Sequence, residues 1–226
     1  MGSDRIREFV SESSDQLHLS HTYDLGGQFM TIDVRDWNGD RSPDLLVRTV
    51  QNYSLVILYN RGDETFEPQL DCGLYIPVFT ANLWEDFNHD GWMDIAQTSE
   101  NGNRIGVALG IDGCSFAPFS YYGAPGDRAE ALRAADMNGD GQLDLITIGS
   151  VGQGINPPSD RLLAVLLGKP DSTFTPNKEV VSIGSVGSNA IDITDLAIGE
   201  VTGDQRPDIV FTFNDGQIKT WKNTCQ

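Results

Sequence analysis

The feature that most constrains the fold is an acidic nine-residue motif that occurs four times. The copies are DWNGDRSPD at 36–44, DFNHDGWMD at 86–94, DMNGDGQLD at 136–144 and EVTGDQRPD at 200–208. They start 50, 50 and 64 residues apart. An internal repeat of this length is typical of propellers and solenoids, in which each repeat is one supersecondary unit.

Each motif is followed by segments with the composition of β-strands. An apolar, β-branched run comes directly after it, as in LITIG at 145–149, and a second run follows, as in SLVILYN at 54–60. A turn then leads to a phenylalanine that aligns in three repeats as Phe66, Phe116 and Phe174. With another strand before each motif, a repeat has the four short strands of a propeller blade. We therefore expect an all-β chain in which residues 1–226 form a single β-propeller domain.

Oxygen-bearing side chains alternate along each motif, at positions 1, 3, 5 and 9. Such a segment can curl around one cation, and Ca²⁺ takes about six to eight oxygens from carboxylates, amides, backbone carbonyls and water. An EF-hand is disfavoured, because position 12 of the third copy is Thr147 and a strand follows. With position 7 included, the candidate calcium ligands are Asp36, Asn38, Asp40, Ser42, Asp44, Asp86, Asn88, Asp90, Trp92, Asp94, Asp136, Asn138, Asp140, Gln142, Asp144, Glu200, Thr202, Asp204, Arg206 and Asp208.

The four candidate sites differ in quality. The second and third copies have Asp at positions 1, 5 and 9, Asn at 3 and Gly at 6, whereas the first has Arg41 at position 6. The fourth starts with Glu200 and has the weaker ligand Thr202 at position 3, so we expect it to bind calcium least well. The alternative for all four is a set of Asx-type turns that hydrogen bonds hold without metal.

The unit D-x-N-x-D-G-x-x-D-L, followed by V-x-L-x-N and a phenylalanine, resembles the FG-GAP/VCBS repeat family. That family includes the calcium-binding blades of integrin α-subunits and related lectins and adhesins, and the resemblance covers nearly the whole chain. It implies a β-propeller whose loops bind calcium beside strand ends and which serves as a recognition platform. Familiar members often have seven blades, whereas this chain has four units, so the resemblance leaves the blade number open.

The chain ends suggest how a ring would close. The last repeat stops at WKNTCQ, before its fourth strand, while the N-terminus has a segment that belongs to no repeat. We expect the strand around Leu17–Leu25 to pair with the strand in IKTWKN and complete the last blade. A monomeric four-bladed ring is favoured, and a dimer whose two half-rings make eight blades is the alternative.

Charge and hydropathy limit the partners. The formal net charge of −18 argues against nucleic acid or an anionic membrane surface. No run of about 18 apolar residues is present, which disfavours a transmembrane span. Met1-Gly2-Ser3 is typical of a cloning start, so we expect that a native signal peptide has been removed and that the protein is extracellular or at the cell surface.

Other residues carry weaker signals. The apolar residue at position 2 of each motif, Val201 in the fourth, is expected to pack inside the protein. Trp92 lies where other repeats have polar residues, so it could stack on a ligand or cover a neighbouring loop. Asn52 is in an N-glycosylation sequon. The three cysteines, Cys72, Cys114 and Cys225, form no CxxC pair, which disfavours zinc, and their pairing is left open.

The sequence shows no nucleophile–base constellation beyond the carboxylates assigned to metal, so an enzyme is not expected. We expect a calcium-stabilised recognition module of the lectin or adhesion type, whose ligand is a glycan or a protein. The alternatives are a polysaccharide-active enzyme domain or its accessory domain, and a structural segment of a larger adhesin.

Overall fold

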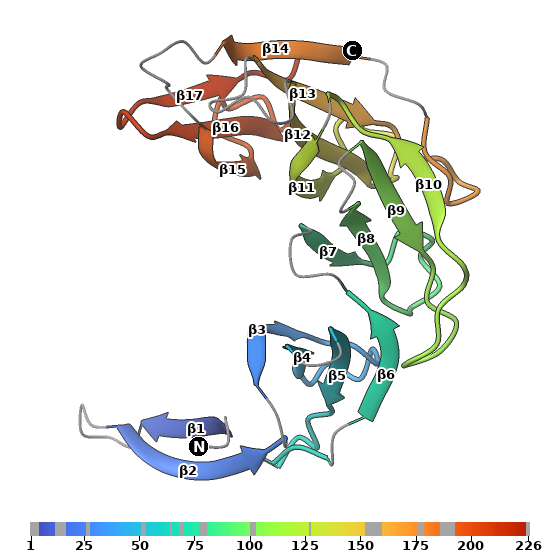
Figure 1. The fold of residues 1–226 in the computed structure, drawn as a ribbon, viewed down its shortest axis with the longest axis vertical. Coiled ribbons are helices and arrows are strands. Elements are labelled where there is room, and N and C mark those ends of the chain that lie inside the picture. Colours follow the sequence, from blue (N-terminus) through green and yellow to red (C-terminus); the bar gives the residue numbers. More distant parts are fainter. Residues whose placement is uncertain are drawn as a thin grey trace. The chain divides into compact units, whose positions relative to one another are not determined.

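The computed structural model describes residues 5–11, 17–25, 28–50, 53–63, 65–67, 70–76, 81–99, 103–126, 128–151, 160–175, 179–185 and 193–224. All regular elements in these ranges are β-strands, β1 to β17, and paired strands run antiparallel (Figure 1). The expected all-β class is confirmed. In the same ranges, no helix is long and apolar enough to cross a membrane.

The chain divides into two compact units. The first contains Met1–Val78 together with Ile111–Phe116, and the second contains Phe79–Gly110 together with Ala117–Gln226. The sequence predicts that residues 1–226 form a single domain. That prediction depends on how the two units join, so it stays a prediction.

The first unit has a hairpin and a four-stranded sheet. The hairpin pairs β1 (Arg5–Ser11) with β2 (Leu17–Asp24). The sheet has the order β3-β4-β5-β6, so each strand pairs with its neighbour in the sequence. Its strands are β3 (Phe29–Arg35), β4 (Asp44–Thr49), β5 (Ser54–Leu58) and β6 (Leu70–Tyr75).

The second unit has three further sheets built in the same order. One contains β7 (Asn82–Glu85), β8 (Asp94–Thr98), β9 (Arg104–Ala108) and β10 (Ser120–Gly123). The next contains β11 (Arg128–Ala135), β12 (Asp144–Val151), β13 (Asp160–Leu166) and β14 (Glu179–Ser185). The last contains β15 (Ile193–Gly199), β16 (Asp208–Phe213) and β17 (Ile218–Trp221).

The repeat inferred from the sequence recurs in the backbone. In three sheets the first strand has a register shift against the second, and this β-bulge begins seven residues before the acidic motif, at Phe29, Ala129 and Ile193. A bulge at a fixed place is a designed feature of a repeat, since it bends the strand and increases its twist. Three of the four repeats therefore share this bulge as well as their order of strands.

Apolar side chains join neighbouring sheets of the second unit. One buried cluster includes Phe87, Leu132 and Phe174, and it joins the β7–β10 sheet to the β11–β14 sheet. A second cluster includes Ile146 and Phe211, and it joins the β11–β14 sheet to the β15–β17 sheet. Each fully buried side chain of this size contributes about 1.5–3 kcal/mol relative to an exposed one.

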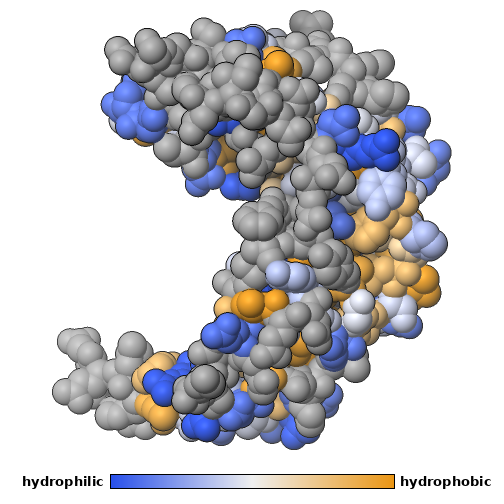
Figure 2. Space-filling view, in the orientation of Figure 1, coloured by the Kyte–Doolittle hydropathy of each residue, from blue (hydrophilic) through white to orange (hydrophobic). Residues whose placement is uncertain are grey.

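The face drawn in Figure 2 intersperses hydrophobic with hydrophilic residues.

The expected packing of motif position 2 is confirmed in three repeats and wrong in the fourth. Trp37, Phe87 and Met137 are buried, whereas Val201 is 57% exposed. Trp37 contacts the ring of Phe116, as Phe87 contacts that of Phe174, so the packing partner is the phenylalanine of the next repeat.

The N-terminal segment forms the expected strand, and this strand pairs with β1. In the part of the chain that the structure describes, the last sheet has three strands, and Leu17–Leu25 falls mainly in β2, which pairs with β1. A hairpin with a five-residue connection closes a short loop, which costs less entropy than a pairing across the whole chain. Completion of the last sheet by this segment stays a prediction.

A disulfide that the sequence left unassigned joins Cys72 to Cys114. Cys72 lies in β6, and Cys114 lies in the hairpin turn 111–116. The carbonyl of Gly113 in the same turn accepts hydrogen bonds from Trp37 Nε1 at 2.5 Å and from the Tyr59 hydroxyl at 3.0 Å. A turn that follows β9 in the sequence is thus fixed to the first sheet. Cys225 lies outside the described residues.

Removal of this disulfide should destabilise the first unit. The linked cysteines are 42 residues apart, and the chain-entropy relation gives about 4 kcal/mol for a loop of that length. We expect Cys114→Ser and Cys72→Ser to lower the urea midpoint under oxidising conditions, and dithiothreitol to lower that of the wild type but not of either variant. Cys225→Ser is the control, and an equal loss in that variant would contradict the assignment.

Candidate metal-binding loops

The four acidic motifs adopt one backbone turn. Positions 4 and 6 have positive φ in every copy, between 58° and 91°. Glycine adopts this region readily, but other residues lose about 1–2 kcal/mol there. Arg41, His89 and Gln205 nevertheless occupy such positions. Contacts around the loop therefore impose its shape, whatever residue stands there.

The carboxylate at position 9 links each loop to the next hairpin turn. In the second motif, Asp94 Oδ2 accepts the Phe87 N–H at 2.8 Å, and Oδ1 accepts the Gly110 N–H at 2.7 Å. The other three copies repeat the arrangement, with donors from position 2 and from the second residue after the third strand of the sheet. The copies at position 9 are Asp44, Asp144 and Asp208, and all four carboxylates are fully buried.

Position 5 is the centre of a second set of hydrogen bonds. In the third motif Asp140 Oδ1 accepts the N–H of Gln142 at 2.8 Å, and Asp140 Oδ2 accepts the side-chain amide of Asn138 at 2.8 Å. Asn138 Oδ1 in turn accepts the Asp140 N–H at 2.9 Å. These are Asx-type turns, and they recur in the first two motifs. Asx-type turns, which the sequence analysis gave as the alternative for these loops, therefore shape the first three loops.

The carboxylate at position 1 accepts backbone N–H groups of its own loop. Asp136 accepts backbone N–H groups from Gly139 and Gly141 at 2.7 and 2.8 Å. Asp36 Oδ2 accepts the Arg41 N–H at 2.8 Å, but its Oδ1 is buried and has no hydrogen-bond partner. A buried carboxylate oxygen without a partner is costly, because it has lost its hydration and gained nothing. A cation in the first loop would satisfy it.

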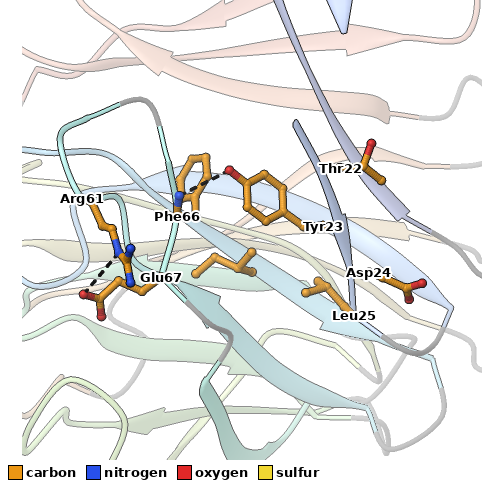
Figure 3. A pocket seen from close by; sticks show the side chains of 8 residues that line it. Thr22, Tyr23, Asp24, Leu25, Arg61, Phe66 and Glu67 are labelled. Atoms are coloured by element: carbon orange, nitrogen blue, oxygen red, sulfur yellow. Dashed lines mark hydrogen bonds and ion pairs between the residues drawn. The ribbon is translucent and has the colours of Figure 1, made fainter. Parts of the chain in front are cut away.

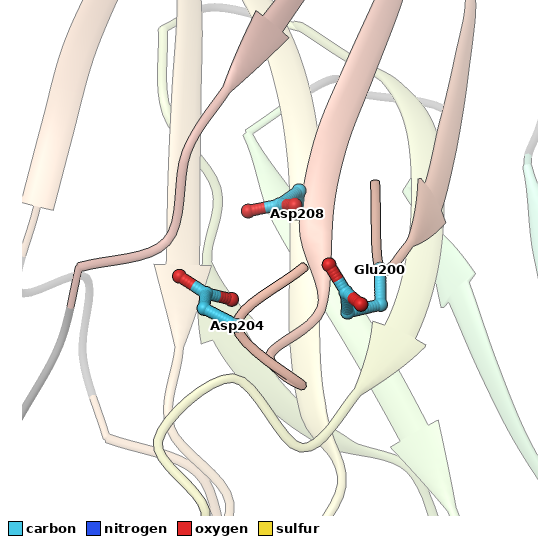
Figure 4. Close-up of side chains that lie close together, drawn as sticks. All are labelled: Glu200, Asp204 and Asp208. Atoms are coloured by element: carbon cyan, nitrogen blue, oxygen red, sulfur yellow. The ribbon is translucent and has the colours of Figure 1, made fainter. Parts of the chain in front are cut away.

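The fourth motif brings its carboxylates closest together. One oxygen from each of Glu200, Asp204 and Asp208 lies within 4.8 Å of the others, so this group could hold a metal ion (Figure 4). Lys222 Nζ lies 3.6 Å from Asp204 and already offsets part of that negative charge. The sequence ranked this loop last for its ligand types, whereas the geometry gathers its carboxylates best.

The pKa of the carboxylate at position 9 shifts in one direction in the first three loops and in the other direction in the fourth. Burial raises the pKa of Asp94 to about 6, and it also raises the pKa of Asp44 and Asp144, with smaller contributions from the other aspartates of each loop. For Asp208 the N–H of Asn223 dominates and lowers the pKa. The first three loops therefore each hold a position-9 carboxylate whose charged form is disfavoured by burial.

Among the described residues, the structure thus brings the carboxylates of positions 1, 5 and 9 together in the fourth loop and not in the first three. The chemistry of this donor set fits a hard cation such as calcium. At position 7 the structure shows backbone N–H donors, from Ser42, Trp92, Gln142 and Arg206, to the carboxylate of position 5. Trp92 is partly buried, so its proposed stacking role stays a prediction. Asn52 lies outside the described residues.

Comparisons with known proteins agree with the repeat and the fold. The profile of the FG-GAP-like repeat matches residues 86–147. No curated protein sequence matches the chain significantly. Among solved structures, the chain is similar to an Agrocybe aegerita lectin described as specifically recognising non-reducing terminal N-acetylglucosamine, with a TM-score of 0.58 and 19% identity. The match covers 86% of this chain and 53% of the lectin, so the chain spans about half of the lectin's length.

The two kinds of position-9 carboxylate should respond differently to the same substitution. Asp94→Asn and Asp208→Asn each place an amide NH₂ against a backbone N–H. Asp94→Asn also removes a charge that the folded protein disfavours at pH 7.5, because the pKa of Asp94 is raised to about 6. Asp208→Asn removes a charge that the folded protein favours, because the pKa of Asp208 is lowered.

We therefore expect Asp208→Asn to lose more stability than Asp94→Asn in metal-free protein. Urea unfolding at pH 7.5 in EDTA measures both variants against the wild type. Asp215→Asn, at an exposed turn position, controls for the change in net charge. A larger loss in Asp94→Asn would show that its hydrogen bonds outweigh the cost of burying its charge.

Proposed function

We propose that this chain is a calcium-stabilised β-propeller module that recognises glycans outside the cell. The observation that carries the proposal is the similarity in fold to a lectin that recognises N-acetylglucosamine, over 86% of this chain. The four-repeat order of antiparallel sheets supports the propeller, because each complete sheet is a four-stranded meander like a propeller blade. The FG-GAP-like match supports calcium and recognition through the resemblance described above.

Calcium is proposed for the acidic loops, with positions 1, 3, 5 and 9 as ligands. When bound, the ion would neutralise carboxylates that are buried at the strand ends. The chain's own residues prepare the loops for it: position 9 links the loop to the next hairpin turn, and position 5 closes the Asx turns. The unpartnered Asp36 Oδ1 in the first loop supports the same assignment.

An extracellular location is proposed on the strength of the Cys72–Cys114 disulfide, since disulfides form and persist mainly in oxidising compartments. Binding without catalysis is proposed for the same module. The acidic residues that would attract an enzymatic interpretation already hold the loops together. This leaves recognition as the role that the architecture supports best.

Glycan recognition has a direct test. Labelled protein in calcium should bind a subset of an array of neutral and acidic glycans, with N-acetylglucosamine-terminated structures included. The same preparation, incubated with soluble polysaccharides, should release no reducing ends. Binding to no glycan on the array would contradict the lectin-type function, and release of reducing ends would favour the enzymatic alternative.

Removal of calcium should lower the melting temperature markedly. A ligand that binds only the native state adds about 2.7 kcal/mol per site when its concentration is a hundredfold above Kd. Scanning calorimetry in calcium and in EDTA measures the difference. An unchanged melt in protein shown to be metal-free would contradict calcium stabilisation.

The loops should contribute unequally to that difference. In calcium, Asp140→Ala should lower the melting temperature more than Asp204→Ala, because the third motif has the better ligand set and the fourth already has Lys222 beside Asp204. Both variants are compared again in EDTA, where the difference between their melting temperatures should become smaller. Equal or reversed losses in calcium would show that the clustered carboxylates of the fourth loop matter more than ligand type.

A further inference from the structure

A cavity of about 490 Å³ lies in the first unit, and none of the residues that line it belongs to the acidic loop. It is formed between the end of β2 and the hairpin turn that follows β5, and its volume is in the range of ligand sites, about 300–1,000 Å³. The residues that line it are Thr22, Tyr23, Asp24, Leu25, Leu58, Arg61, Phe66 and Glu67.

One part of the cavity wall is apolar and fixed. The rings of Tyr23 and Phe66 meet edge to face with centroids 5.5 Å apart, and Leu58 is fully buried beside them. The Tyr23 hydroxyl accepts the Phe66 N–H at 3.3 Å, so the ring is oriented while its own O–H proton is not used in that bond. Leu25 points to the same side of β2 as Tyr23 (Figure 3). This wall offers a rigid surface for the C–H face of a ligand.

The polar end of the cavity consists of Arg61 and Glu67. Arg61 Nε lies 3.8 Å from Glu67 Oε1, and both side chains are about half exposed. That distance is longer than a hydrogen bond, so the guanidinium donors and carboxylate oxygens are able to bind hydroxyl groups. The two charges cancel locally, in a chain whose net charge is −18. A neutral ligand with several hydroxyl groups fits this end better than an anion.

The same contact recurs in the second unit without the polar end. Tyr122 meets Phe174 edge to face with centroids 5.4 Å apart, as Tyr23 meets Phe66. At the places of Arg61 and Glu67 stand Lys169 and Thr175, and the Thr175 hydroxyl already accepts the Leu167 N–H at 3.0 Å. The aromatic pair is therefore a structural feature of the repeat, whereas Arg61 and Glu67 are particular to the cavity.

We propose that this cavity binds one or two units of a neutral saccharide, with Tyr23 and Leu25 against its apolar face and Arg61 and Glu67 on its hydroxyl groups. The inference rests on the proposed glycan recognition and assigns it a place. Sugars combine an apolar face with a hydroxylated edge, which is the combination that these walls present. The acidic loops keep a separate, structural role.

The test uses the whole chain in calcium, with N-acetylglucosamine and its β1,4-linked disaccharide as first probes and the strongest array ligand as the next. Arg61→Ala and Glu67→Ala should each weaken binding in calorimetric titrations by roughly 10-fold to 100-fold, because each removes charge-assisted hydrogen bonds. Lys169→Ala, at the matched position of the second unit, should bind like the wild type. Glu67→Gln keeps the size of the side chain if the alanine variant proves unstable.

A spectroscopic readout places the ligand independently. Saccharide should shift the methyl resonances of Leu25 and Leu58 in the wild type and leave those of Leu145, in the second unit, unchanged. Wild-type binding that survives both Arg61→Ala and Glu67→Ala would overturn this site and leave glycan recognition standing. No binding to any glycan would overturn the function itself, and preference for sialylated or sulfated glycans would overturn the neutral class.

Discussion

One buried carboxylate in each repeat, at position 9 of the acidic motif, organises the structure around it. Its two oxygens accept backbone N–H groups from the acidic loop and from the next hairpin turn, so a single side chain fixes both connections at one end of a sheet. A buried charge is costly unless hydrogen bonds or a counter-charge compensate it. The hydrogen bonds are supplied by the fold in every repeat. The counter-charge would be a cation that the surrounding aspartates attract.

This linkage also places the residues proposed for recognition. The hairpin turn held by Asp44 through the Asn60 N–H carries Arg61 and, after the turn, Phe66 and Glu67. The acidic loop proposed to bind metal and the cavity proposed to bind saccharide are thus distinct sites connected by one carboxylate. A cation that stabilised the acidic loop would stabilise the turn with it, so calcium dependence of glycan binding would require no contact between ion and sugar.

Sequence reasoning predicted features that depend on local pattern. Strands after each motif, the shared turn and the burial of position 2 in the first three motifs follow from composition and period, and all are found. It could not predict contacts set by packing at long range. The Cys72–Cys114 bond joins segments 42 residues apart, and the cavity depends on Tyr23 meeting Phe66. The aligned phenylalanines were a signal for that contact, but their partner tyrosines lie at variable distances in the sequence.

The disulfide-linked turn 111–116 belongs to the second repeat by sequence and to the first unit by its contacts. The sequence repeat and the compact unit are therefore out of phase. A fragment cut at the repeat boundary would lose the Gly113 carbonyl that accepts bonds from Trp37 and Tyr59, and would leave Cys72 unpaired. Shuffling or duplicating such repeats must carry the turn of the following repeat along, so the segment that can be inherited or engineered as a module is longer than the period that the motifs display.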